Sequence, residues 1–129
     1  MKTRKPLTWM GSSKKDLLSL PRSIQKMMGH SLNLAQQEKE DDDCKILKGF
    51  GSASVREVIK DDPGGTYRAI YTVRFKEAIY VLHVFQKKSH SGIETPKKDM
   101  DLIKKRLKEA QILHNIMEKG DKHEKKKTL

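Results

Sequence analysis

Three strand-forming segments follow one another directly in the second half of the chain, and this succession constrains the fold more than any other feature. Residues 55–60, 66–75 and 78–87 are rich in Val, Ile, Tyr and Thr, which favour strands. The run Asp61-Asp-Pro-Gly-Gly65 is a strong turn signal, and Lys76-Glu77 is a short connection. Sequential strands with short turns pair with their neighbours, so the sequence predicts an antiparallel meander.

Helical patterns precede this β half. Residues 6–10 alternate weakly and predict a short first strand. Ser13 is a suitable N-cap for a helix starting at Lys14. Pro21 suits the first turn of a second helix, whose apolar spacing continues to about Gln37.

A last helix is predicted after the meander. Thr95 is a candidate N-cap with Pro96 at the first helical position, and the expected end lies near Lys119-Gly120. The apolar stripe of this helix is expected to consist of Met100, Ile103, Leu107, Ala110 and Leu113, with Lys104, Lys105, Arg106 and Lys108 among its polar positions. Together these elements predict an α/β (α+β) fold: a single domain over residues 1–119, followed by a basic, disordered tail over residues 120–129.

Charge and cysteine usage narrow the class of protein. The 129 residues carry a formal net charge of +11, which favours a polyanionic partner such as nucleic acid over a basic surface kept for solubility. Cys44 is the only cysteine, so no intrachain disulfide can form and a reducing cytoplasm is expected. No apolar run approaches the roughly 18 residues of a membrane span.

The sequence predicts neither a metal nor a small-molecule cofactor. The five histidines are scattered without the spacing of a zinc site. The acidic run from Glu38 to Asp43 is interpreted as a solvated loop, because blocks of like charge repel one another. The alternative is a divalent-cation site, for which the run lacks the spaced ligands and the glycine turn of a calcium loop.

Strand alternation groups the chemically useful side chains. If both hairpin turns are tight, Arg68 lies opposite Phe85, and Ile70 lies opposite His83. The face with Arg68 is then expected to carry Glu57, Ile59, Arg74, Val81, His83, Phe85 and Lys87. The other face is expected to present Tyr67, Ala69, Tyr71, Tyr80, Leu82 and Val84 to the helices. A slip of one residue would break this grouping.

Such a cationic face suits RNA cleavage without a metal. A base must take the proton of a 2′-hydroxyl, cations must stabilise the phosphorane, and an acid must protonate the 5′-oxygen. The imidazole of His83 suits acid–base work, Arg68 offers a fork for phosphate, and Lys87 or Lys88 supplies charge or a proton. The alternatives are a histidine hydrogen-bonded in the core and an Arg68 salt bridge with Glu57.

An ordered set of motifs is similar to the phage-derived, HigB-type branch of the RelE toxin superfamily. The resemblance runs over most of the chain, from about Pro6 to Ala110, and an ordered set of motifs carries it. Its members are Leu47-Lys-Gly-Phe-Gly51, Arg56-Glu-Val58, Thr66-Tyr-Arg-Ala-Ile-Tyr71, Tyr80-Val-Leu-His-Val-Phe-Gln-Lys-Lys88 and Thr95-Pro-Lys-Lys98. The resemblance implies a RelE-like fold, in which N-terminal helices pack on a small twisted antiparallel sheet.

The resemblance also implies a function. The protein would be the toxin of a type II toxin–antitoxin system, an endoribonuclease that cleaves mRNA in the ribosomal A site. Its partner would be a helix-turn-helix antitoxin of the HigA-like kind. The alternatives are a non-catalytic module that binds RNA or the ribosome, and a phage structural or assembly protein.

Residue roles follow from the resemblance position by position. Arg68 matches the strand arginine that contacts the scissile phosphate, and Lys88 or Lys87 matches the basic residue at the end of the last strand. The chain departs from the family pattern where it has Glu57 and Ile59, so His83 and Glu57 both stay candidates for the general base. The expected RNA-binding residues are Arg74, Phe85, His90, Lys97 and Lys98.

Overall fold

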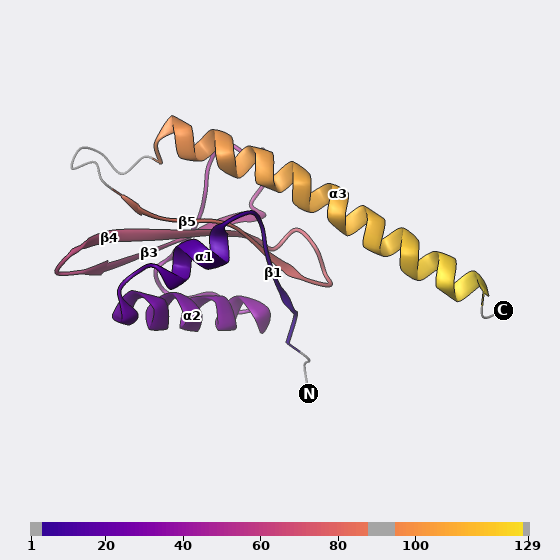
Figure 1. Cartoon of the computed structure of the whole chain (residues 1–129), viewed down its shortest axis with the longest axis horizontal. Coiled ribbons are helices and arrows are strands. Elements are labelled where there is room, and N and C mark those ends of the chain that lie inside the picture. Colours follow the sequence, from indigo (N-terminus) through magenta and orange to yellow (C-terminus); the bar gives the residue numbers. More distant parts are fainter. Residues whose placement is uncertain (1–3, 88–94, 128–129) are drawn as a thin grey trace.

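One five-stranded sheet with helices on both faces forms the protein. This computed structural model describes residues 4–87 and 95–127, with side chains described as far as residue 120. The strand order is β1-β5-β4-β3-β2; helices α1 and α2 cover one face, and α3 crosses the other (Figure 1). The predicted α+β class is confirmed. The elements are β1 (Leu7–Trp9), α1 (Ser13–Leu18), α2 (Arg22–Gln36), β2 (Cys44–Ile46), β3 (Val55–Asp62), β4 (Gly65–Thr72), β5 (Ile79–Lys87) and α3 (Lys97–Lys127).

The predicted meander forms with the predicted register over most of its length. Asp62 pairs with Gly65, so Pro63 and Gly64 alone make the first turn. Ile59 pairs with Arg68, and Arg68 in turn pairs with Phe85. The tight turn fixes the face that Ile59 shares with Arg68, because side chains alternate strictly from that point.

A β-bulge changes the register at the far end of β5. Ile70 still pairs with His83, but Tyr71 pairs with Val81, which leaves Leu82 as an extra residue on β5. Because the side-chain period of a strand is two, one extra residue reverses the faces beyond it. Val81 therefore packs with Tyr71 beneath α1 and α2, whereas Tyr80 and Leu82 pack beneath α3; the prediction for these three β5 residues was wrong.

The sheet is mixed rather than purely antiparallel. β1 lies parallel to β5, with Leu7 opposite Ile79. The three-residue strand β2, which the sequence did not predict, pairs antiparallel with β3 at the other edge. β2 is short, and Lys45 and Ile46 within it are exposed, so it lacks the apolar alternation by which a strand is recognised.

Both faces of the sheet are buried. On one face, α1 and α2 place Leu17, Ile24, Met28, Leu32 and Ala35 against the sheet. On the other face, α3 places Ile103, Leu107 and Ala110 against residues such as Ile70 and Tyr80. The sheet face that carries Arg68 is therefore covered by α3 rather than open. Leu113, which was expected in the apolar stripe of this helix, is exposed instead.

Helix α3 continues beyond its expected end. It runs to Lys127, although Lys119-Gly120 was expected to terminate it. A glycine inside a helix costs only about 1 kcal/mol relative to alanine, and no proline follows to stop the helix. The proposed division of the chain between residues 119 and 120 stays a prediction. Neither α3 nor any other helix of the described ranges is long and apolar enough to cross a membrane.

The acidic run is more than a solvated loop. Asp42 and Asp43 are exposed as expected, but the Asp41 carboxylate is largely buried and contacts two elements. It accepts hydrogen bonds from the Ser31 hydroxyl of α2 and from the Lys60 ammonium of β3, 3.0 Å from its Oδ2. Burial alone would raise the pKa of Asp41. The Asp43 backbone N–H, the Ser31 hydroxyl and Lys60 outweigh that effect and lower the pKa to about 2.

Because folding lowers the pKa of Asp41, its contacts stabilise the folded protein fully above pH 3.8, the ordinary pKa of this carboxyl group. That stabilisation is lost as the pH falls toward 2. We expect Asp41→Asn to reduce the free energy of unfolding at pH 7 by about 2 kcal/mol. Urea unfolding at several pH values measures this. The difference from wild type should shrink between pH 4 and pH 2, and exposed Asp42→Asn is the control. An Asp41→Asn deficit that stays constant down to pH 2 would contradict the assignment.

Candidate functional site: a cationic pocket over a buried ion pair

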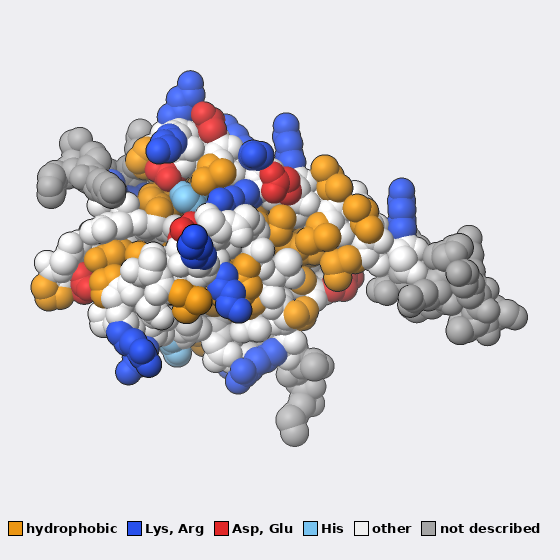
Figure 2. Space-filling model, viewed as in Figure 1, with side chains coloured by type: hydrophobic (Ala, Val, Ile, Leu, Met, Phe, Trp, Pro, Cys, Tyr) orange, Lys and Arg blue, Asp and Glu red, His pale blue; other side chains and the backbone are white. Residues whose placement is uncertain are grey.

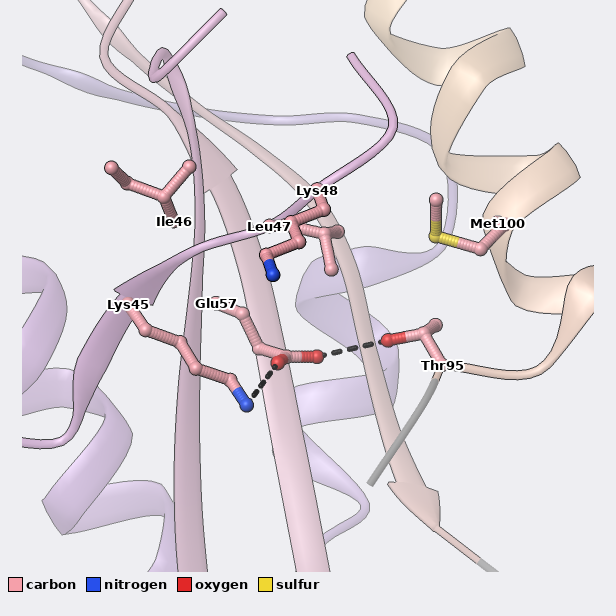
Figure 3. A pocket seen from close by; sticks show the side chains of 7 residues that line it. All are labelled: Lys45, Ile46, Leu47, Lys48, Glu57, Thr95 and Met100. Carbon is pink, nitrogen blue, oxygen red and sulfur yellow. Dashed lines mark hydrogen bonds and ion pairs between the residues drawn. The ribbon is translucent and has the colours of Figure 1, made fainter. Parts of the chain in front are cut away.

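A cavity of about 570 Å³ opens between the β2–β3 edge of the sheet and the start of α3. Figure 3 shows the side chains around it, which come from segments far apart in the sequence. The lining residues are Lys45, Ile46, Leu47, Lys48, Glu57, Thr95 and Met100. The volume is in the range of small-molecule and nucleotide-sized binding clefts.

A buried ion pair forms the floor of this pocket. The Arg68 Nη1 atom donates to Glu57 Oε2 at 2.9 Å, and both side chains are almost completely buried. The Thr95 hydroxyl joins them: it accepts from Arg68 Nη1 at 3.1 Å and donates to Glu57 Oε2 at 3.0 Å. The salt bridge between Arg68 and Glu57, which the sequence offered as one alternative, is therefore present. Thr95, which was expected to cap α3, bonds to both partners of this pair instead.

Two lysines give the pocket its charge. Lys45 lies directly across from Glu57 in the β2–β3 ladder, and its ammonium is 3.5 Å from Glu57 Oε1. In Figure 3, Lys45 and Thr95 approach Glu57 from opposite sides, while the Lys48 side chain points into the cavity above them. Among the described residues that line the pocket, Glu57 is the only acid. With Arg68 behind it, the pocket has a net positive charge and suits a phosphate group.

His83 lies in a second polar cluster that ties β5 to α3. Its Nε2 atom is 2.7 Å from Asp99 Oδ1, and its Nδ1 atom is 3.5 Å from Arg106 Nη1. Arginine can only donate, so Nδ1 accepts and the proton sits on Nε2, from which it is donated to Asp99. Both ring nitrogens are thus engaged within the protein. This arrangement favours a hydrogen-bonded core histidine over a base that faces substrate.

The Arg106 side chain is buried and bonds to residues of other segments, although the sequence predicted it among the polar positions of α3. Its Nη1 atom donates to the Leu82 carbonyl at 3.0 Å, and its Nη2 atom donates to the Ser12 hydroxyl at 3.1 Å. Gly11 has a positive φ of 54°, and a Cβ there would come within 2.7 Å of Arg106 Nε. The guanidinium therefore packs against a backbone position where only glycine fits.

The other described residues that the sequence predicted for the site do not line the pocket. Phe85 stacks on the His83 ring with centroids 4.6 Å apart, rather than facing solvent as a free platform. Lys87 ends β5 opposite Thr66, and Lys97 and Lys98 are exposed in the first turn of α3. Lys88 and His90 lie outside the described residues, so the expected bend between Lys87 and Lys88 stays a prediction.

Arg74 lies on the α3 side of the sheet, as Arg68 does, but beyond the end of their strand and away from the pocket over Arg68. β4 ends at Thr72, so strand alternation no longer applies two residues later. Arg74 is exposed in the β4–β5 connection, where it lines a separate cavity of about 340 Å³ with Phe75 and His114.

Several site residues were missed by sequence reasoning. Lys45 sits in the unpredicted strand β2, and Lys48 belongs to the Leu47–Gly51 motif, whose lysine was not assigned a role. Asp99 and Arg106 are seven residues apart on α3, so they share its inner face. That helical spacing is the signal that could have identified them as a pair aimed at the sheet.

The fold and the pocket define a small α+β protein with a cationic site built across an edge of its sheet. The family model described as Phage derived protein Gp49-like (DUF891) matches residues 15–108, well over half of the chain. The chain therefore belongs to this Gp49-like family, which is part of the RelE/HigB-like toxin superfamily. A search of curated proteins found no match.

The buried pair gives a direct test of the pocket floor. Removing one partner of a buried ion pair leaves an uncompensated charge and typically costs about 3–5 kcal/mol. We expect Glu57→Leu to destabilise the protein by about that amount, and the double variant Glu57→Leu/Arg68→Met to recover most of it. Chemical denaturation measures both variants.

Lys45→Ala is the matched control for this test, because it removes the exposed partner of Glu57 and should cost under about 1 kcal/mol. If Glu57→Leu were as mild as Lys45→Ala, or if the double variant were no more stable than Glu57→Leu, the ion pair would not form the floor described.

Proposed function

We propose that the protein is the toxin of a type II toxin–antitoxin system and acts as a ribosome-dependent mRNA endoribonuclease of the HigB-like kind. The observation that carries the proposal is the cationic pocket over the Arg68–Glu57 pair. Membership of the Gp49-like family, which is consistent with a toxin-like module, supports it. The net charge of +11 supports a nucleic-acid substrate.

The proposed chemistry uses side chains alone. Lys45 and Lys48 bind the phosphodiester, and Arg68 behind them stabilises the negative charge of the phosphorane. When the phosphate draws Lys45 away, Glu57 Oε1 accepts the proton of the 2′-hydroxyl, whose oxygen attacks the adjacent phosphorus. The bond to the 5′-oxygen breaks, and a lysine ammonium of the pocket protonates that oxygen. The products are a 2′,3′-cyclic phosphate and a 5′-hydroxyl end.

The remaining sequence-predicted residues take supporting roles in this proposal. Lys87, Lys97 and Lys98 bring further positive charge to the message, and Lys88 and His90, which lie outside the described residues, stay candidates for contact with it. His83 acts as a positioning residue, since it fixes the start of α3 through Asp99. The partner that restrains such a toxin would be a helix-turn-helix antitoxin of the HigA-like kind, and both would act in the cytoplasm.

A second candidate is a non-catalytic module that binds RNA or the ribosome. The observation in its favour is that Arg68, Glu57 and His83 all bond to other protein groups. Two exposed lysines over a pocket suffice for binding to a phosphate backbone. The two candidates differ in one outcome: only the endoribonuclease creates new RNA ends.

Exposed lysines give the sharpest test of the site, because their removal does not disturb the core as an Arg68 substitution would. We expect Lys45→Ala/Lys48→Ala to relieve growth arrest and to slow cleavage of a translated message about 100-fold. Primer extension on that message measures the cleavage. Lys14→Ala/Lys15→Ala is the matched control: it removes the same charge from exposed lysines of α1, on the opposite face of the sheet.

Thermal unfolding should be unchanged in both double variants, because all four lysines are exposed. Equal loss of cleavage in the two variants would point to overall charge rather than to this pocket. A wild-type protein that arrests growth but leaves no new 5′ ends would favour the binding module. Cleavage of free RNA without ribosomes would overturn the proposed ribosome dependence.

A further inference from the structure

The second half of α3 presents apolar side chains to solvent. In Figure 1 this part of the helix extends beyond the sheet, away from both α1 and α2. The residues that bury the helix against the sheet are Ile103, Leu107, Ala110 and His114, spaced by three or four positions. Their spacing defines the inner face of α3, and a helix needs no large apolar residues on its outer face for stability.

Four large apolar residues in this half of the helix are nevertheless exposed, and we call them the α3 ridge: Ile112, Leu113, Ile116 and Met117. Their exposed fractions are 60%, 36%, 61% and 53%. At spacings of one, four and five residues they form a contiguous stripe, not scattered positions. Figure 2 shows orange side chains gathered over this part of the helix. Contiguous exposed apolar groups of this kind mark interaction sites.

Positive charge borders the α3 ridge along one side. Lys108 precedes Ile112 by four residues, and Lys119 follows Ile116 by three, so both lie on the same side of the helix as these isoleucines. From residue 104 to 119, the exposed charged side chains are Lys104, Lys105, Lys108 and Lys119 against Glu109 and Glu118. Glu118 is also held 3.3 Å from the His114 ring. The surface around the ridge is therefore net basic.

We propose that the α3 ridge docks an amphipathic, acidic helix of a partner protein. The apolar side of that helix would cover Ile112 and Ile116, and its Asp and Glu residues would meet Lys108 and Lys119. A second copy of this chain fits less well, because it would bring like-charged lysine borders together on a protein of net charge +11. The inference rests on the proposed function only in naming the antitoxin as the source of this helix.

The ridge is separate from the cationic pocket. Met100 lines the pocket and Ile112 begins the ridge, and twelve residues of helix span about 18 Å. Substitutions on the ridge should therefore leave RNA cleavage intact. Binding of a helix to the ridge and cleavage of RNA in the pocket can be measured, and can fail, independently.

Fluorescence anisotropy with two synthetic peptides tests the proposal on the full-length protein. Both peptides are amphipathic helices with leucine at positions i, i+3, i+4 and i+7; one carries glutamate at its flanking positions and the other carries lysine. The acidic peptide should bind wild type at least about tenfold more tightly than the basic one. Ile112→Ser/Ile116→Ser should weaken binding of the acidic peptide by about tenfold or more.

Leu18→Ser is the matched control, because Leu18 on α1 is as exposed as Ile116, at 61%, and lies on the other side of the sheet. It should not change binding. Equal binding of the acidic peptide to wild type and to Ile112→Ser/Ile116→Ser would overturn the proposal. So would a wild-type dimer in light scattering that the same double variant converts to monomer, since a second copy would then occupy the ridge.

Discussion

The buried ion pair between Arg68 and Glu57 is the constraint on which the rest of the structure depends. Two charges removed from water are tolerated only when they are paired and their remaining hydrogen-bonding groups are satisfied. Here the pair joins neighbouring strands, and the Thr95 hydroxyl bonds to both partners. Thr95 lies two residues before α3. The pair therefore links the start of the covering helix to β3 and β4, whose alignment the two-residue turn sets.

The sequence predicted strand pairing correctly where the local turn signal is strong. The Asp61–Gly65 turn fixed the pairing of Ile59 with Arg68, because a two-residue loop leaves one register. Sequence reasoning failed at Leu82, where a bulge reverses the faces without any glycine or proline to announce it. It also failed at Lys45, because a three-residue edge strand depends on tertiary contacts that no local pattern encodes. Arg106 was missed although its helical spacing from Asp99 places both on the inner face of α3.

The proposed chemistry requires Glu57 to accept a proton, whereas in this structure both of its carboxylate oxygens contact cationic side chains. Lys45 stands 3.5 Å from Glu57, and Arg68 stands 2.9 Å from it, so the carboxylate is neutralised by its neighbours in this structure. A phosphate entering beside Lys45 competes for the ammonium, because charge-assisted bonds to a phosphate oxygen are at least as favourable as those to a carboxylate. On the proposed function, substrate itself would free Glu57 Oε1, while Arg68 and Thr95 stay bonded to Oε2 and hold the side chain in place.

On the proposed function, the different contacts of the two Glu57 oxygens explain how this residue serves as the base, although the chain departs from the family pattern at this position. A base must be anchored so that its free oxygen keeps its direction, and it must be basic enough to take a proton once substrate arrives. The bonds to Oε2 supply the anchor through buried groups, and the bond to Oε1 is supplied by an exposed lysine. Because water can solvate the half-exposed Lys45 ammonium, the contact to Oε1 can change partners at lower cost than the buried bonds to Oε2.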